Sequence, residues 1–345
     1  MYEVDFLPVE SESGTGSKSG DAIALRFTVE AENRNAVMVI DGGFSRIGDN
    51  LADHIAEYYG TGVIDLIVST HPDADHLNGL STLMEKMRVR ELLVHQPGLH
   101  TKDISNFSNL ESLESLLAIA RSRGVVITEP FTGLTRFGGQ VSILGPTASY
   151  YQLLLEQHLA DERSGAAHSH KSSLGSVVRG LLSKALPYLP IETLGEDGET
   201  SPRNNTSVIT LLRVGSHTMM FTGDAGIPAL DAACDEYERT VGAFSVAPLN
   251  FFQAPHHGSR RNLAPSILNR ILGEPGSPHL PKVTAFISSA KISEKHPSPK
   301  VVNALSRRGC QVFATEGRTI TQWNGAPSRK NWTTLTPFGP LSEDD

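Results

Sequence analysis

A buried strand that ends in a cluster of potential metal ligands is the feature that most restricts how this chain can fold. Residues 64–70 (Ile-Asp-Leu-Ile-Val-Ser-Thr) are largely apolar, which is typical of a strand covered on both faces. The next six residues are His-Pro-Asp-Ala-Asp-His. A strand end followed by a short loop can direct several side chains to one point, so the segment predicts a metal site built from His71, Asp73, Asp75 and His76.

Strands and helices alternate through the surrounding sequence. Strands are expected at residues 4–9, 21–27, 36–40, 91–94 and 125–127, and helices at 51–59, 77–87 and 110–123. A hairpin is expected about Gly215, between residues 207–212 and 218–222. This order indicates an α/β protein with more than one sheet.

Residues 148–202 differ in character from the rest. Helices are expected at 151–163 and 174–186, with a polar loop at 195–199. We interpret the stretch as a helical insertion or lid within a single domain that spans residues 1–345. His168 and His170 in this insertion could reach the metal site, although loop histidines are more often simply exposed.

The composition restricts the setting in which the chain works. With 345 residues, 39% hydrophobic and 20% charged, it is expected to be an ordinary globular protein with a sizeable core. It has no apolar run of the roughly 18–20 residues that a membrane helix needs, no signal-peptide pattern and only Cys234 and Cys310, so we expect a cytoplasmic protein that does not contact membranes. The net charge of −8 argues against non-specific coating of nucleic acid, but a bound metal would supply local positive charge for a phosphate-containing ligand.

Several further motifs follow in an order that resembles the metallo-β-lactamase superfamily. The segment from His71 to His76 is similar to its His-x-His-x-Asp-His motif, and Asp41 ends a strand as the superfamily's early aspartate does. Asp224 in Phe-Thr-Gly-Asp resembles the metal-bridging aspartate, and Pro-His-His-Gly-Ser at 255–259 resembles the late histidine motif. The resemblance covers almost the whole chain except residues 148–202. It implies an αββα four-layer sandwich with a helical insertion and a hydrolase that depends on two divalent metal ions.

The motifs are closest to the hydrolase domain of ComEC-type DNA-uptake proteins and their stand-alone relatives. Shared with that subgroup are Gly-Asp-Ala at 20–22, Asn-x-x-Ser at 204–207, His-His-Gly-Ser at 256–259 and His-Pro-x-Pro at 296–299. Stand-alone relatives can act as effector nucleases in anti-phage defence. The resemblance therefore implies an antiviral role beside a partner protein in a multi-gene system, and it leaves the oligomeric state open.

The resemblance also implies how the ligands divide between two ions. His71 and Asp73 are expected to serve the first ion, Asp75 and His76 the second, and Asp224 to bridge both. Asp73 stands where many members have histidine. Oxygen ligands are harder than imidazole, so manganese or magnesium becomes as eligible as zinc.

Two positions in this ligand set stay open. Either His256 or His257 is expected to complete the second site, and His256 is preferred because it lies closer to the end of the preceding strand. The first site has no clear third ligand, because the middle motif holds Asn-Asn-Thr-Ser at 204–207. That site is either weak, or completed by Asn205 or water, or filled only together with substrate.

The remaining candidates support the ligands or contact substrate. Asp41 is expected to orient His71 or His76 through a hydrogen bond rather than to bind metal. His296 precedes a helix start at Ser-Pro and, by resemblance, would donate a proton to the leaving group or hold a phosphate oxygen. Substrate contacts are expected from a polar set that could equally form solvated turns: Asn205, Ser207, Ser259 and Arg260.

The expected reaction is hydrolysis by a hydroxide generated between the two ions, with Asp75, Asp224 and His296 as the catalytic residues. The oxygen-rich ligand set, the nearby arginines and the subgroup motifs favour a phosphodiester in a nucleic acid or nucleotide, and hence a nuclease or phosphodiesterase. One alternative is a hydrolase of carboxyl esters, thioesters or lactones, and another is a regulatory or binding protein with a vestigial metal site. Metal binding needs neutral histidine and ionised aspartate, so activity is expected to disappear at acid pH.

Overall fold

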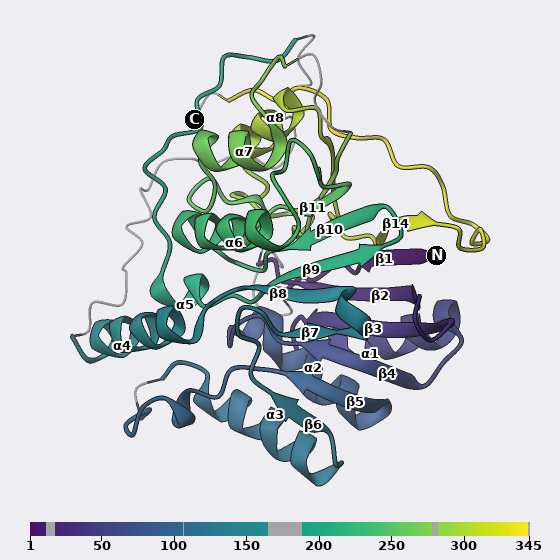
Figure 1. The fold of residues 1–345 in the computed structure, drawn as a ribbon, viewed down its shortest axis with the longest axis vertical. Coiled ribbons are helices and arrows are strands. Elements are labelled where there is room, and N and C mark those ends of the chain that lie inside the picture. Colours follow the sequence, from purple (N-terminus) through teal and green to yellow (C-terminus); the bar gives the residue numbers. More distant parts are fainter. Residues whose placement is uncertain (12–17, 106, 165–187, 278–281, 344–345) are drawn as a thin grey trace.

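The computed structural model describes residues 1–345 except 12–17, 106, 165–187, 278–281 and 344–345. Within this part the chain forms two seven-stranded sheets (Figure 1). The strands of the first sheet, in spatial order, are β14 (Ile320–Asn324), β1 (Tyr2–Phe6), β2 (Ala22–Val29), β3 (Arg34–Gly42), β4 (Val63–Val68), β5 (Arg88–Leu93) and β6 (Val126–Thr128). Those of the second are β13 (Gln311–Ala314), β12 (Thr284–Ile287), β11 (Phe251–Gln253), β10 (His217–Phe221), β9 (Ile209–Val214), β8 (Val141–Gly145) and β7 (Thr135–Arg136).

Both sheets are mixed, and their parallel parts determine where the loops gather. Strands β3, β4, β5 and β6 pair in parallel, as do β10, β11, β12 and β13, whereas the other pairs are antiparallel. The carboxyl ends of neighbouring parallel strands lie at the same edge of a sheet. The loops after β3 and β4 therefore start side by side, and so do the loops after β10 and β11.

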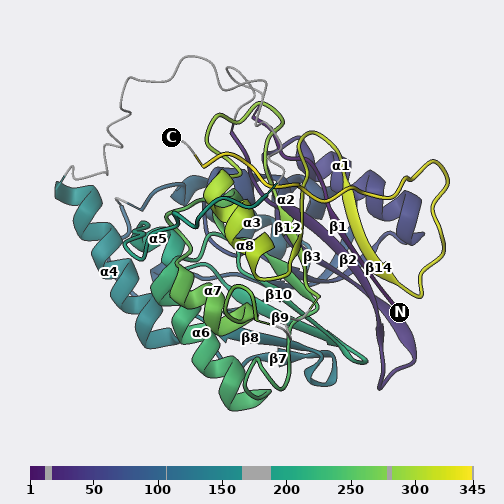
Figure 2. The same cartoon turned by 90° about the horizontal axis from the view of Figure 1, so that it is seen from above.

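Helices cover the outer face of each sheet, which gives four layers in the order αββα (Figure 2). The first sheet is covered by α1 (Ile47–His54), which continues as a π-helix (Ile55–Tyr59), and by α2 (Ala74–Lys86) and α3 (Leu110–Ser122). Helix α4 (Ala148–Ser164) lies to one side and adds Tyr151, Leu155 and Leu159 to the same core. The second sheet is covered by α6 (Ile227–Thr240), α7 (Pro265–Leu272) and α8 (Pro299–Arg307). Helix α5 (Pro202–Asn205) is a single turn that contacts α4, and short 3₁₀ turns occur at Pro97–Leu99, Phe137–Gly139 and His256–Gly258.

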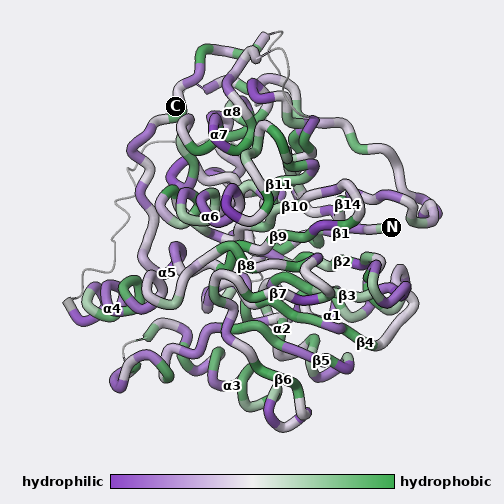
Figure 3. The backbone as a smooth tube through the Cα atoms, viewed as in Figure 1, coloured by the Kyte–Doolittle hydropathy of each residue, from purple (hydrophilic) through white to green (hydrophobic). Residues whose placement is uncertain are grey.

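Three hydrophobic cores lie between these four layers. The side chains of a strand point alternately to its two faces, and β3 shows how this serves two cores at once. Its residues Ala36, Met38 and Ile40 lie in the core between the sheets, whereas Val37 and Val39 pack under the helices. Figure 3 accordingly shows the central strands as mostly hydrophobic. The sequence-based prediction of an α/β fold with more than one sheet, arranged as αββα, is confirmed.

Some predicted boundaries shift in a way that matters for the site. Helix α2 begins at Ala74 rather than Leu77, so Asp75 and His76 lie in its first turn. The helix expected at 151–163 is part of α4, whereas the one expected at 174–186, and with it His168 and His170, lies outside the described residues. The hairpin about Gly215 is present as β9 and β10. Among the residues described, no helix combines the length and hydropathy needed to cross a bilayer.

Candidate metal centre

Three loops that follow strands and the end of a fourth strand supply the centre. His71, Asp224 and His256 each stand three residues after the last residue of a strand, namely β4, β10 and β11. Asp41 lies within the last residues of β3. Because these strand ends lie at neighbouring edges, residues more than 180 positions apart in sequence meet at one place.

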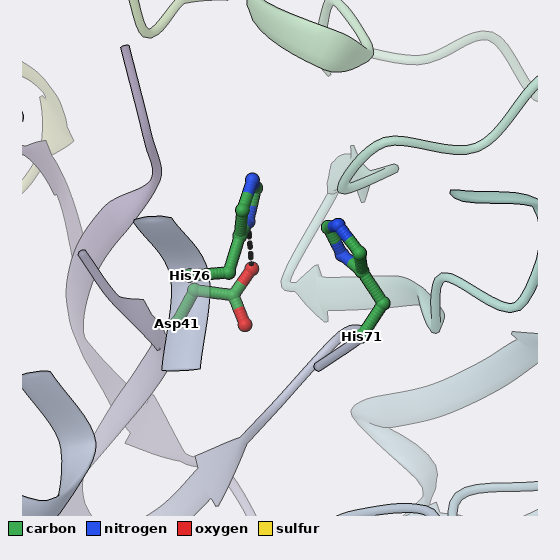
Figure 4. A group of neighbouring side chains, drawn as sticks. All are labelled: Asp41, His71 and His76. Carbon is green, nitrogen blue, oxygen red and sulfur yellow. Dashed lines mark hydrogen bonds and ion pairs between the residues drawn. The ribbon is translucent and has the colours of Figure 1, made fainter. Parts of the chain in front are cut away.

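Asp41 is completely buried and holds one of the histidines. Its carboxylate accepts hydrogen bonds from the backbone N–H of Thr70 (2.8 Å) and from its hydroxyl (2.6 Å). The same carboxylate lies 2.8 Å from Nδ1 of His76, which we take as the donor (Figure 4). The proton of His76 is then on Nδ1, and the lone pair of Nε2 is free to bind a cation.

His71 lies beside His76, with the two ring centroids 4.3 Å apart (Figure 4). Nδ1 of His71 lies 3.0 Å from Oγ1 of Thr70 and 3.3 Å from Oγ of Ser207. Its Nε2 is buried 3.7 Å from both Oδ2 of Asp73 and Oδ2 of Asp224. As in His76, contacts at Nδ1 hold the ring of His71, and its Nε2 faces the carboxylates of Asp73 and Asp224.

Asp224 faces two different sets of side chains with its two carboxylate oxygens. Oδ1 lies 3.4 Å from Nε2 of His76. Oδ2 lies 3.7 Å from Nε2 of His71 and 3.5 Å from Nε2 of His256. The carboxylate thus stands between two groups of potential ligands, as a bridging ligand would.

The two groups can be defined from these distances. The first half-site consists of Oδ2 of Asp224 together with His71, Asp73 and His256. The second half-site consists of Oδ1 of Asp224 together with Asp75, His76 and His257. Two ligands bound tetrahedrally to one ion at about 2.1 Å are about 3.4 Å apart. The measured separations of 3.4–3.9 Å between ligand atoms are close to that value.

The placement of His256 and His257 differs from the sequence-based preference. Nε2 of His257, not of His256, lies 3.6 Å from Oδ2 of Asp75 in the second half-site. Both histidines have left-handed backbone angles, with φ of 48° and 58°, within a single 3₁₀ turn. Their ring planes are 82° apart, so consecutive side chains point to different half-sites. His256 thereby occupies the first half-site, where the sequence showed no third ligand.

An asparagine holds His256 in this orientation. Nδ1 of His256 lies 3.0 Å from Oδ1 of Asn262, to which it can donate, and also 3.0 Å from Nδ2 of Asn204. Donation from Nδ1 to Asn262 leaves Nε2 as the nitrogen that faces Asp224. Asn204 belongs to the middle motif, so that motif lies beside His256 rather than supplying a ligand of its own.

Most of the residues predicted to contact substrate are buried, and two of them form hydrogen bonds within the protein. Oδ1 of Asn205 accepts a hydrogen bond from Gly226 N–H (3.0 Å), and Oγ of Ser207 accepts one from Asp224 N–H (3.1 Å). Both side chains are buried beneath the ligand loops, so they position these loops instead of facing a substrate. Ser259 is also buried, and of the four only Arg260 is exposed.

His296 lies at the border of the centre. Its ring centroid is 6.0 Å from that of His256 and 6.2 Å from that of His257. Burial, with the neighbouring His257 and His256, lowers the pKa of His296 to about 3, so the ring is neutral near pH 7. The expected helix after it begins at Pro299, as the Ser-Pro pair predicts.

Two charged residues of the centre were missed by the sequence interpretation as site residues. Nε of Arg203 lies 2.6 Å from Oδ1 of Asp73, with about a quarter of the guanidinium side chain exposed. Asp21 is buried beside His76, with Oδ2 3.7 Å from its Nδ1. The Gly-Asp-Ala motif was a signal for Asp21, whereas nothing in the spacing around Arg203 indicated a role.

The buried charges of the centre shift one another's protonation. Burial alone would raise the pKa of Asp224, but His256, His76 and His257 lower it well below the usual range. Burial likewise opposes the charged form of His76, yet Asp224 and Asp41 raise the pKa of that imidazole well above its usual value. Ionised aspartates that favour the protonated form of a neighbouring imidazole create a buried place that favours positive charge, which a divalent ion would supply instead of the proton.

Unpartnered atoms provide a test of whether a metal ion fits. Nε2 of His71, Nε2 of His76, Nε2 of His257 and Oδ1 of Asp224 are all buried, and none has a hydrogen-bond partner among the described residues. Buried polar atoms almost always have such partners. Four exceptions that all face one cluster fit a centre that is completed by divalent cations.

No family model matches the chain, and neither does any curated protein. Among solved structures, the metallo-β-lactamase fold protein YhfI from Bacillus subtilis is 10% identical over 94% of this chain and 100% of that one, with a TM-score of 0.46. Unliganded yeast PDE1 is 11% identical over 92% and 98% of the two chains, with a TM-score of 0.45.

A mutant of the CmlA β-hydroxylase is 12% identical over 93% of this chain, with a TM-score of 0.45. This chain spans 53% of the length of that protein. Likenesses at such low identity and TM-score concern the arrangement of elements and say nothing of the reaction.

Proposed function

We propose that this protein is a hydrolase that works with two divalent metal ions. The observation that carries the proposal is the position of Asp224, whose two carboxylate oxygens face two separate sets of ligand atoms. Three of the nitrogens in these sets are buried without a hydrogen-bond partner in the described part of the chain. A carboxylate between two such sets is the arrangement that dinuclear hydrolases use.

Some of these residues would bind the ions, and others hold the binding side chains in place. The first ion would be held by His71, Asp73 and His256, the second by Asp75, His76 and His257, and both by Asp224. Divalent ions, when bound, activate water and stabilise negative charge that develops on the substrate. Asp41, Ser207 and Asn262 would fix the imidazole rings so that Nε2 is the nitrogen available to the ion.

A phosphodiester in a nucleic acid or nucleotide is the substrate class that we propose. Three aspartates among the ligands make the centre rich in hard oxygen donors, which suit manganese or magnesium as well as zinc. Arg203 lies against the first half-site with part of its guanidinium exposed, and Arg260 is exposed after the His-His-Gly-Ser turn. Guanidinium groups match phosphate oxygens in a bidentate way.

A substrate panel tests this proposal directly. The purified chain would be assayed with manganese, magnesium or zinc on bis(p-nitrophenyl) phosphate, DNA, RNA and cyclic nucleotides, and in parallel on an acyl ester, a thioester and a lactone. We expect metal-dependent cleavage of phosphodiesters that is lost in Asp75→Ala and Asp224→Ala. Asp53→Ala, which changes an exposed carboxylate on α1, is the matched control and should leave cleavage unchanged.

Two results would contradict the proposal. Cleavage of the acyl substrates alone would replace the phosphodiester by a carboxyl-type electrophile. Unchanged metal content and unchanged activity in both ligand variants would show that the ligand assignment is wrong.

A further inference from the structure

Asp21 lies next to the second half-site, and its carboxylate has none of the roles described so far. It stands immediately before β2 and is 1% exposed. Its Oδ2 accepts a hydrogen bond from Nε2 of Gln253 (2.8 Å). Its Oδ1 is buried and has no hydrogen-bond partner within the residues that the structure describes.

The chain fixes Asp21 against one ligand loop through its backbone. The N–H of Asp21 donates to the carbonyl oxygen of Asp75 (3.1 Å). A Cβ at the preceding Gly20 would lie only 2.2 Å from that same oxygen, so a side chain there would force the two segments apart. Glycine at position 20 therefore lets the start of β2 lie directly on the loop that carries Asp75 and His76.

Gln253 ties Asp21 to the other ligand loop. While its Nε2 donates to Asp21, its Oε1 accepts from the N–H groups of Thr222 (2.9 Å) and Gly223 (3.3 Å). These residues immediately precede Asp224. Asp21 is thus connected to the loops of Asp75 and Asp224, which are the two carboxylates of the second half-site.

The distances direct Asp21 toward the atoms that would surround the second ion. An oxygen of Asp21 lies within 4.8 Å of ligand atoms of Asp224 and His257, which are in turn within that distance of each other. Ligand atoms on opposite sides of one cation, each bound at about 2.2 Å, are about 4.4 Å apart. The three side chains are therefore spaced as members of one coordination sphere.

We propose that Asp21 is a further ligand of the second ion. This inference rests on the dinuclear centre proposed above and deepens it, because it predicts how the ligand set of that half-site affects different metals. Three carboxylates and two imidazoles make five ligands, namely Asp21, Asp75, Asp224, His76 and His257. Zinc favours four ligands in a tetrahedron, whereas manganese accepts more ligands and prefers oxygen, so Asp21 should contribute more to the binding of manganese than to that of zinc.

Metal titration of the chelator-treated, folded protein tests the role of Asp21 without reference to activity. Calorimetry and elemental analysis would give the number of ions bound and their affinities for manganese and for zinc, in the wild type and in Asp21→Ala and Asp21→Asn. We expect two manganese ions in the wild type. In both variants the second ion should bind at least about 10-fold more weakly, with a smaller loss for zinc.

Asp5→Asn is the matched control, since Asp5 is equally buried in the neighbouring strand but lies in a different cluster. It should leave both metal affinities unchanged. An Asp21→Asn variant with full manganese affinity would overturn the inference. So would one that loses affinity for manganese and for zinc by the same factor, because a residue that only supports the ligands should affect both metals alike.

The outcome also separates this inference from the proposed function. If the wild type binds two ions and Asp75→Ala and Asp224→Ala lose them while Asp21→Ala does not, only the role of Asp21 is wrong. If the wild type binds no ion at all, the proposed function fails together with it.

Discussion

Two buried clusters of charged side chains lie on the first sheet or at its edge. The carboxylates of one are fully hydrogen-bonded within the protein, whereas the other contains buried polar atoms without a partner in the described chain. The latter is the metal centre. The former, which we call the closed cluster, lies on the outward face of β1 and consists of Glu3, Asp5, Arg26, His54, Tyr59 and Arg329.

In the closed cluster every carboxylate oxygen has a partner from the chain itself. Arg329 donates to both oxygens of Asp5 (3.0 and 2.7 Å) and to Oε1 of Glu3 (3.0 Å). The Tyr59 hydroxyl (2.6 Å) and His54 Nε2 (2.9 Å) also contact Asp5, and Arg26 contacts Oε2 of Glu3. The carboxylates of the metal centre instead face imidazole nitrogens that have no hydrogen-bond partner in the described chain.

This difference separates a structural cluster from a functional one. Burial does not distinguish them, because Asp5 and Asp41 are both 0% exposed. Completeness of hydrogen bonding does: the protein neutralises the closed cluster by itself and leaves the metal centre to be neutralised by what it binds. Each prediction below changes one cluster and asks whether the other responds.

The largest effect is expected from Arg329→Met. The substitution leaves the Asp5 and Glu3 carboxylates buried without their main cation, which should lower the free energy of unfolding by about 3–5 kcal/mol. Urea unfolding measures this. Metal stoichiometry of the folded variant should stay that of the wild type, and a loss of metal would show that the two clusters are coupled.

The next largest effect is expected in the pH dependence of stability, to which Asp5 of the closed cluster contributes. Although burial opposes it, hydrogen bonds and charge from His54 and Arg329 lower the pKa of Asp5 to about 2, from an ordinary value of 3.8. Because the folded pKa is lowered, the contribution of about 2 kcal/mol is present above pH 4 and is lost as the pH falls toward 2. Unfolding curves from pH 6 to pH 2 should therefore lose less stability in Asp5→Asn than in the wild type. Equal slopes would contradict this.

In the metal centre, Asp41→Ala should act on metal binding. Without Asp41 the proton and orientation of His76 are no longer fixed, and loss of such support weakens metal binding by about 10–100-fold. Calorimetric titration measures the change. Asp65→Ala, a carboxylate of β4 that bonds to Arg34 and to the backbone of β3, is a control that should not affect it.

The smallest effect is expected from Asp224→Asn in the presence of chelator. The histidines that lower the pKa of Asp224 favour its charged form, so the metal-free variant should lose about 1 kcal/mol of stability. With metal the difference from the wild type should be larger. Destabilisation of the metal-free protein by several kcal/mol would instead place Asp224 in a closed network like that of Asp5.

The sequence predicted the parts of the centre that depend on local order. The segment from His71 to His76 was recognisable because it follows an apolar run that forms a strand, and Asp41 and Asp224 were expected from the resemblance of their motifs to the metallo-β-lactamase superfamily. The assignment of His256 and His257 was not accessible, since it depends on left-handed backbone angles in one turn. Arg203 and Asn262 reach the centre through contacts that no spacing in the sequence shows, whereas the Gly-Asp-Ala motif was a signal for Asp21.

The closed cluster shows the same limit. Glu3 and Asp5 alternate with Tyr2, Val4 and Phe6 in β1, a pattern that predicts a solvated outer face. Both are buried instead, because the π-helix after α1 and the C-terminal segment with Arg329 cover that face. The sequence separation between Glu3 and Arg329 is 326 residues, so only the folded chain shows that they pair.

The turn at His256 and His257 has a consequence for how the centre fills. His256 belongs to the first half-site and His257 to the second. The two half-sites are therefore joined by one peptide bond and by the carboxylate of Asp224. An ion that binds in either half-site would order the turn. The second ion would then bind with a smaller loss of conformational entropy. Loading should therefore be cooperative: the titration curve should be sigmoidal, and under limiting metal the apo and fully loaded molecules should outnumber those that carry a single ion.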